Sequence, residues 1–142
     1  ERYSALFAQV SEEASRVTTA GLPSVREVVI ALSVANRRIA ATLHSLRSGR
    51  SFVHTVNSPK GLDEWSFEAI RREYEDSWRE LGIAAAQPIE SPIRVSHPFF
   101  GPLNAAEWMA ALVYEHEMQT RQLDRLMRTQ EYASAQGAKW NP

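Results

Sequence analysis

The sequence contains no cysteine, few glycines and no long apolar run, and each shortage excludes a class of site. Without cysteine there is no disulfide, thiolate metal ligand, iron-sulfur cluster or cysteine nucleophile. The six glycines are scattered, so neither a phosphate-binding loop nor a dinucleotide-binding fingerprint is present. No apolar stretch approaches the roughly 20 residues that cross a bilayer, which predicts a protein without a membrane span.

An excess of charge of one sign is also missing. The 16 Lys and Arg residues nearly balance the 17 Asp and Glu residues, which leaves a formal charge of -1. A balanced chain offers no electrostatic footprint for a phosphate backbone, so we expect no nucleic-acid partner. The N-terminus lacks the basic-then-apolar pattern of a secretion signal, and we therefore expect a cytoplasmic protein with no membrane partner.

The composition is that of a globular protein. The 142 residues are 44% hydrophobic and 23% charged, which is typical of a chain that buries one core. This length is close to that of one ordinary domain. We therefore expect residues 1–142 to form a single domain.

Apolar residues recur every three or four positions in four stretches, which predicts four amphipathic helices. Two of the starts carry a capping pattern, Ser24 with Glu27 and Asn104 with Glu107. Since no convincing strand pattern accompanies them, the sequence predicts an all-α fold, a four-helix bundle. The expected helices cover residues 3–17, 24–49, 67–81 and 104–136.

Two long connections make the expected topology less simple than up-down-up-down. In the first, residues 50–62, we expect Phe52, Val53 and Val56 to pack onto the bundle. The second, residues 87–103, holds four prolines, which argue against a regular helix or a central strand. We interpret it as an ordered crossover or cap.

The second connection also contains an unusual aromatic segment, His97-Pro98-Phe99-Phe100-Gly101-Pro102. Two aromatic residues held between prolines can form a rigid wedge over the end of a bundle. A structural plug and direct contact with a substrate are both compatible with this pattern.

Histidines are the first candidates for a metal site or for acid-base chemistry. No two of them lie four residues apart on a helix, and His116-Glu117 is followed by Thr120 where a zinc-protease helix needs histidine. We interpret His44 and His54 as ordinary surface or loop residues. The four histidines are His44, His54, His97 and His116.

Glu115, His116 and Gln119 form a compact polar group in the last apolar stripe. Glu115 and Gln119 lie one turn apart and can point toward the same volume. An intrahelical hydrogen bond at the edge of the core and a pocket wall both remain open. Burial of Glu115 would raise its pKa and make it a proton acceptor, whereas a nearby arginine would lower that pKa.

Five segments follow one another along most of the chain: Ser24-Val25-Arg26-Glu27-Val28-Val29, Ala35-Asn36-Arg37-Arg38-Ile39, His97-Pro98-Phe99-Phe100-Gly101-Pro102-Leu103, Glu107-Trp108 and Gln122-Leu123-Asp124-Arg125-Leu126. In this order they resemble the DinB-like superfamily, and His97 to Leu103 is the most specific part. This resemblance implies a four-helix bundle of DinB-like (DinB/YfiT-type) topology with long crossover connections, and frequent homodimers. It also implies a divalent nickel or zinc site, which some members use as thiol-dependent transferases or isomerases.

The three histidines that hold the family's metal correspond, by the same resemblance, to Ala31, Glu115 and Gln119. A methyl group, a carboxylate and a neutral amide offer too few strong donors for a transition metal. We therefore expect no metal and no other cofactor. Sliding His116 into the site would need a one-residue shift, which rotates a side chain by about 100°.

The resulting hypothesis is a DinB-like protein that binds a small molecule or a partner through the former metal cleft, without metal-dependent catalysis. The alternative is a thiol-dependent transferase or hydrolase that uses Glu115 as a base or holds nickel or zinc in an altered shell. A third possibility is a structural role through self-association. No catalytic residue is assigned, and the pocket candidates are Ala31, His97, Glu115, His116 and Gln119.

Overall fold

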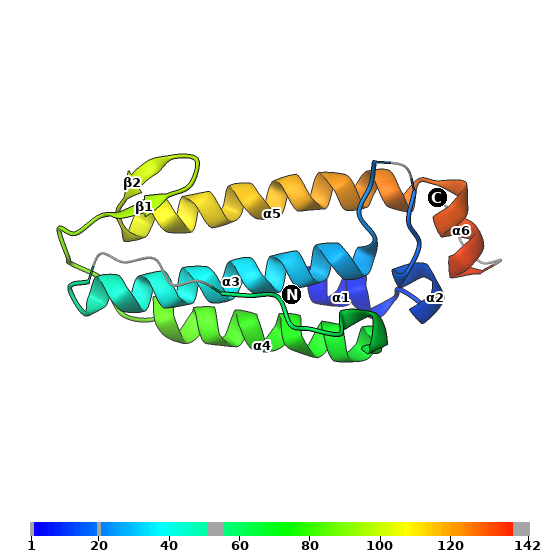
Figure 1. The fold of residues 1–142 in the computed structure, drawn as a ribbon, viewed down its shortest axis with the longest axis horizontal. Helices are drawn as coiled ribbons and strands as arrows, with labels where there is room; N and C mark the ends of the chain where they lie inside the picture. Colours follow the sequence, from blue (N-terminus) through cyan, green and yellow to red (C-terminus); the bar gives the residue numbers. More distant parts are fainter. Residues whose placement is uncertain (1, 20, 51–55, 138–142) are drawn as a thin grey trace.

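Three long helices lie side by side in the computed structural model, which describes residues 2–19, 21–50 and 56–137. They are α3 (Val25–Arg47), α4 (Phe67–Ala85) and α5 (Ala105–Met127). Three short helices gather at one end, and a small β-hairpin lies at the opposite end, beside the start of α5 (Figure 1). The remaining elements are α1 (Arg2–Ala8), α2 (Glu12–Ser15), the 3-10 helix η1 (Leu62–Glu64), β1 (Val95–His97), β2 (Gly101–Leu103) and α6 (Gln130–Gln136).

The prediction of a mainly helical protein is confirmed, and both predicted capping boxes form. The hydroxyl of Ser24 accepts from the backbone N–H of Glu27, whose carboxylate accepts from the N–H of Ser24. Asn104 and Glu107 exchange the same pair of hydrogen bonds at the start of α5. None of the helices in the described ranges is both long and apolar enough to cross a membrane.

Two predicted helices are each broken by a capping side chain. The stretch 3–17 divides into α1 and α2 because the hydroxyl of Ser11 accepts from the N–H of Ala14 and starts a new helix. The stretch 104–136 divides into α5 and α6 because Thr129 does the same for Tyr132. In both places the cap overrides a continuous apolar stripe.

The second connection contains no regular helix, as predicted, but it does contain two strands. Val95 pairs with Leu103 and His97 with Gly101 in an antiparallel hairpin. The turn needs Gly101, whose φ of 74° suits a residue without a side chain. Pro102 is tolerated because this ladder has only two strands, so its missing N–H faces no third strand.

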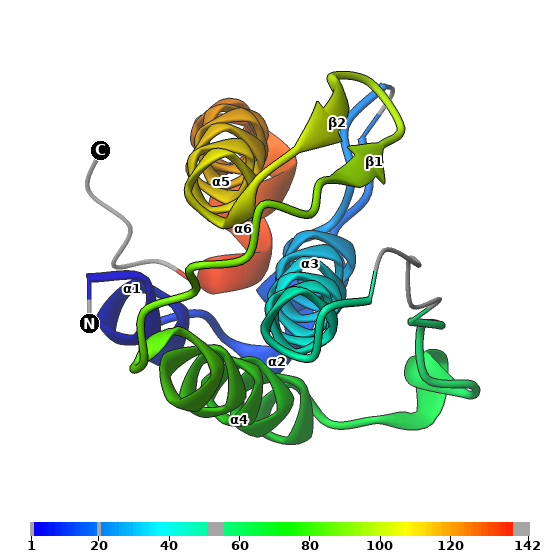
Figure 2. The same cartoon turned by 90° about the vertical axis from the view of Figure 1, so that its left-hand side faces the viewer.

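Helix α3 is the centre of the fold and packs against both α4 and α5 (Figure 2). One core lies toward the short helices around Phe7, Val29 and Tyr132, and another lies toward the hairpin around Leu43 and Trp108. The same view places the hairpin beside α5 on the side away from α1. Helix α5 therefore has a different neighbour on each flank.

Helical periodicity alone does not determine which apolar side chains are buried, and part of the first connection lies outside the described residues. Val113 is apolar but 58% exposed, because it is one residue, or about 100°, beyond the buried Leu112. Trp78 belongs to the apolar stripe of α4 yet stays 39% exposed at its edge. Phe52 and Val53 lie outside the described residues, whereas Val56 is partly buried.

Candidate functional site

A cavity of about 540 Å³ opens between α3, α5 and the turn of the hairpin. Four of the five pocket candidates from the sequence line it: Ala31, His97, Glu115 and Gln119. The fifth, His116, does not. The other lining residues are Leu32, Ala35, Arg38, Phe99, Phe100, Tyr114 and Met118.

The room for this cavity comes from small side chains on α3. Ala31, Ala35 and Arg38 follow one another at spacings of four and three residues, so they share one face of the helix. The two alanines leave space between the α3 and α5 backbones. Arg38 supplies a positive charge at one end of this face.

His97 is the buried polar residue of the cavity and is held by its own turn. The residue is 5% exposed, and its Nδ1 atom accepts from the backbone N–H groups of Phe99 at 3.1 Å and Phe100 at 3.4 Å. Because Nδ1 serves as the acceptor, the proton of the neutral ring is assigned to Nε2. Nε2 lies 3.6 Å from Oε1 of Glu115, so the ring presents an N–H toward that carboxylate.

The hairpin is fastened to α5 through Trp108. The indole Nε1–H donates to the carbonyl of Val95 at 3.2 Å, and the indole ring lies 4.9 Å from the ring of His97. Trp108 itself is 1% exposed. A buried side chain of α5 therefore fixes the strand that carries His97.

The cavity mouth is unusually apolar. Seven large hydrophobic side chains are exposed in the described part of the chain, and four of them line this one cavity. Phe99 is 87% and Phe100 53% exposed, so the aromatic pair does not act as the buried plug that the sequence allowed. The other two are Tyr114 and Met118, and the rings of Phe100 and Tyr114 meet edge to face at 5.9 Å.

The residues at the metal position that the DinB-like resemblance implies do not fit a metal ion. Ala31 has no donor atom, Glu115 offers one carboxylate and Gln119 a weak amide. His97 is close by, but a metal-binding histidine donates its second ring nitrogen to an acceptor, whereas Nδ1 here accepts from two backbone N–H groups. The described ranges contain no group of three His, Asp or Glu side chains placed to hold a metal.

His116 points away from the cavity, toward α4. Its Nδ1 contacts the carbonyl of Leu112 at 3.0 Å, and its ring lies 5.3 Å from that of Trp78. Nε2 is buried and has no hydrogen-bond partner among the described residues. The expectation that His116 lines the pocket with Glu115 is therefore wrong, because neighbouring helical residues point about 100° apart.

Burial lowers the pKa of His116, and this effect exceeds the opposing effects of the Leu112 carbonyl and the charge of Glu115. A His116→Phe variant is expected to have a flatter dependence of stability on pH. Below the ordinary pKa of 6.5 the unfolded chain binds more protons than the folded one, so the free energy of unfolding falls as the pH decreases. Phenylalanine does not bind a proton, so the variant lacks this decrease in the free energy of unfolding at low pH.

Urea unfolding at a series of pH values measures the effect. His44→Phe is the matched control, since His44 is exposed. Equal pH dependence in the wild type and in His116→Phe would contradict the assignment of His116 as a neutral buried side chain.

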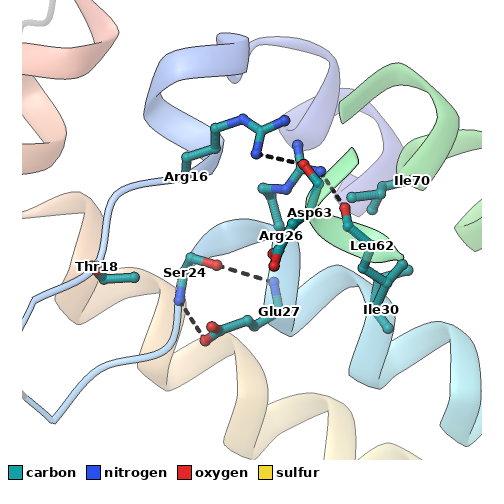
Figure 3. Close-up of a pocket in the computed structure, with 9 residues that line it drawn as sticks. All are labelled: Arg16, Thr18, Ser24, Arg26, Glu27, Ile30, Leu62, Asp63 and Ile70. Atoms are coloured by element: carbon teal, nitrogen blue, oxygen red, sulfur yellow. Dashed lines mark hydrogen bonds between the residues drawn. The ribbon is translucent and has the colours of Figure 1, made fainter. Parts of the chain in front are cut away.

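A smaller cavity of about 180 Å³ lies near the start of α3 and is lined by Arg16 and Arg26 (Figure 3). Both guanidinium groups already have partners. Arg26, 7% exposed, pairs with Glu12 at 2.9 Å and donates to the carbonyls of Leu62 and Trp65. We assign these arginines to the structure and not to ligand binding.

Glu12 organises this second region from the α2 side. Its carboxylate accepts from the backbone N–H of Phe67 at 2.6 Å and from the side chains of Arg16 and Arg26. The bond from Phe67 is the largest cause of the lowered pKa of Glu12, and burial opposes it. The cluster therefore ties α2, α3 and the start of α4 together.

Sequence reasoning did not select several residues of the main cavity. Helix spacing could have identified Arg38, because it lies seven residues after Ala31 and therefore on the same helix face. Tyr114 and Met118 flank the predicted positions on α5 by one residue each. Their role depends on the hairpin, whose position the sequence pattern did not predict.

No model of a protein family, no curated protein and no solved structure matches this chain. The function of the cavity is therefore argued from its own residues. The DinB-like resemblance stays a prediction.

Proposed function

We propose that the chain is a DinB-like four-helix bundle whose former metal cleft binds a small, mainly apolar molecule without metal-dependent catalysis. The observation that carries this proposal is the cavity between α3, α5 and the hairpin. Its volume of about 540 Å³ lies within the range of about 300–1,000 Å³ typical of ligand sites. We extend the proposal to a homodimer, as the resemblance implies, and to a cytoplasmic location.

The residues that line the cavity are better explained by a bound ligand than by a surface that stays uncovered. Large hydrophobic side chains gathered at one site are uncommon on a soluble protein unless something covers them. Here the four exposed ones surround a concave space that also contains Glu115, Gln119 and the N–H of His97. An apolar wall with a few convergent polar groups is the usual chemistry of a small-molecule pocket.

Filling the cavity is expected to remove binding of an uncharged apolar probe. Ala31 is exposed and lines the cavity, so Ala31→Trp adds an indole there with little disturbance of the core. Titration with N-phenyl-1-naphthylamine, followed by its fluorescence, should show a loss of affinity of at least about tenfold, which corresponds to about 1.4 kcal/mol. Ala110→Trp, on the exposed side of α5, should bind as the wild type does.

Two outcomes would contradict the proposal. Equal probe affinity in wild type and Ala31→Trp would place binding elsewhere, and no binding to the wild type would remove the function. Stoichiometric, tight uptake of zinc or nickel that is lost in Glu115→Gln would refute the metal-free part. Light scattering at several concentrations tests the homodimer.

The alternative is a transferase or hydrolase that uses Glu115 as a base. The observation in its favour is that Glu115 faces the cavity with Nε2 of His97 3.6 Å away. This function requires turnover of a thiol-adduct substrate that Glu115→Gln abolishes while the apolar probe still binds. We prefer binding because apolar side chains form most of the lining.

A further inference from the structure

Helix α3 carries four arginines, and three of them are held by partners. Arg26 and Arg37 form ion pairs, and Arg47 donates to backbone carbonyls. Arg38 is the exception: its guanidinium forms no hydrogen bond or ion pair with any described residue. The partners of the other three are Glu12, Leu62, Trp65, Glu73, Glu80, Ala84 and Gln87.

The exception is the arginine that lines the cavity. Arg38 is partly buried, and Leu32, Ala35 and Phe99 are among its apolar companions in the lining. Such surroundings weaken the screening of its charge by water, so an anion brought there would be attracted more strongly than at an open surface. The planar guanidinium also pairs with a carboxylate through two parallel hydrogen bonds.

The acid of the cavity does not neutralise this charge. Glu115 is the one carboxylate in the lining, it faces His97, and it forms no ion pair with Arg38. Arg38 lies seven residues along α3 from Ala31, about 10 Å at 1.5 Å per residue. The cavity therefore holds a positive charge that has no ion-pair partner among the described residues.

Building on the proposed function, we propose that the ligand is an apolar molecule with a single anionic oxygen group of the carboxylate type. The anionic group pairs with Arg38. The apolar body lies between the α3 alanines and the cluster of Phe99, Phe100 and Met118. Arg38 is thus assigned as the residue that selects charge, and the exposed hydrophobic side chains as the surface that the ligand covers.

Two fluorescent probes with one ring system test this selection. 8-Anilino-1-naphthalenesulfonate is an anion, and N-phenyl-1-naphthylamine is the same skeleton without the charged group. The wild type should bind the anion more tightly. Arg38→Gln should weaken anion binding by about tenfold, since one charge-assisted pair is lost, and should leave the neutral probe within about twofold.

Matched variants separate the effect of the lost charge from a general disturbance of the fold. Arg121→Gln removes a charge from the exposed side of α5 and should change neither affinity. Arg38→Lys keeps the charge without the planar fork and should restore part of the anion affinity. The midpoint of urea unfolding confirms that each variant is folded.

The outcomes distinguish the two proposals. Equal anion affinity in wild type and Arg38→Gln, or a wild type that prefers the neutral probe, would overturn the selection by Arg38 while leaving an apolar pocket intact. Failure of both probes to bind, or binding that Ala31→Trp does not reduce, would instead overturn the proposed function.

Discussion

Trp108→Ala is expected to lower the free energy of unfolding by about 3–5 kcal/mol, the usual cost of truncating a fully buried tryptophan. The side chain is 1% exposed and packs in the core toward the hairpin. Its removal leaves a void and also deprives the carbonyl of Val95 of the indole N–H.

The same substitution is expected to reduce ligand binding, although Trp108 does not line the cavity. The indole holds β1, and β1 ends at His97, whose Nδ1 accepts from the backbone of Phe99 and Phe100. Without the indole, the hairpin turn that carries both phenylalanines is no longer fixed against α5. Affinity for N-phenyl-1-naphthylamine should therefore fall along with stability.

Chemical unfolding and probe titration measure the two effects separately. Trp108→Phe keeps a buried aromatic ring but loses the hydrogen bond and part of the indole volume, so it should retain more of the stability than Trp108→Ala. Trp78→Ala is the control for loss of a tryptophan at a site that is 39% exposed. Unchanged probe affinity in a folded Trp108→Ala protein would refute the role of this residue as the hairpin anchor.

Local signals predicted the long helices well because their causes are local. The capping boxes at Ser24 and Asn104 satisfy the first free amide groups of a helix with side chains three residues apart. The breaks at Ser11 and Thr129 have the same cause, yet the surrounding apolar stripes continue through them. Periodicity alone therefore overestimated the length of two helices.

Part of the cavity could be predicted from the sequence. Which residues could be predicted depends on whether a helix or the hairpin carries them. Glu115 and Gln119 were predicted from their register on one helix and Ala31 from the DinB-like resemblance, and the structure brings all three to one cavity. His116 shows the limit of that reasoning, since a single step along the helix turns it toward Trp78.

The hairpin contribution could not be predicted from register. Its strands are three residues long and include a proline, so they carry no recognisable alternation. Their position depends on the long-range bond from Trp108 to Val95. The exposed Phe99 and Arg38, which has no charged partner among the described residues, belong to one cavity only because the hairpin lies beside α3 and α5.

The second large effect is expected at Arg26, where replacement by methionine should cost about 2–4 kcal/mol because a buried guanidinium is removed and its partly buried acceptors lose their charged donor. Arg26 is 7% exposed and donates to the carbonyl of Leu62 (Figure 3). It also donates to Glu12 and to the carbonyl of Trp65. Methionine fills much of the space but donates nothing. A loss at the lower end of this range is expected if water replaces the arginine at Glu12, because the Glu12 side chain is half exposed.

Arg16→Met is the matched control, because Arg16 contacts the same carboxylate from a side chain that is 44% exposed. An exposed ion pair of this kind contributes about 0–1 kcal/mol. Urea unfolding of both variants near neutral pH measures the difference. Equal losses would show that the cluster acts through surface charge alone, whereas a much larger loss for Arg26→Met would show that the buried guanidinium fastens α2, η1 and the start of α4 to α3.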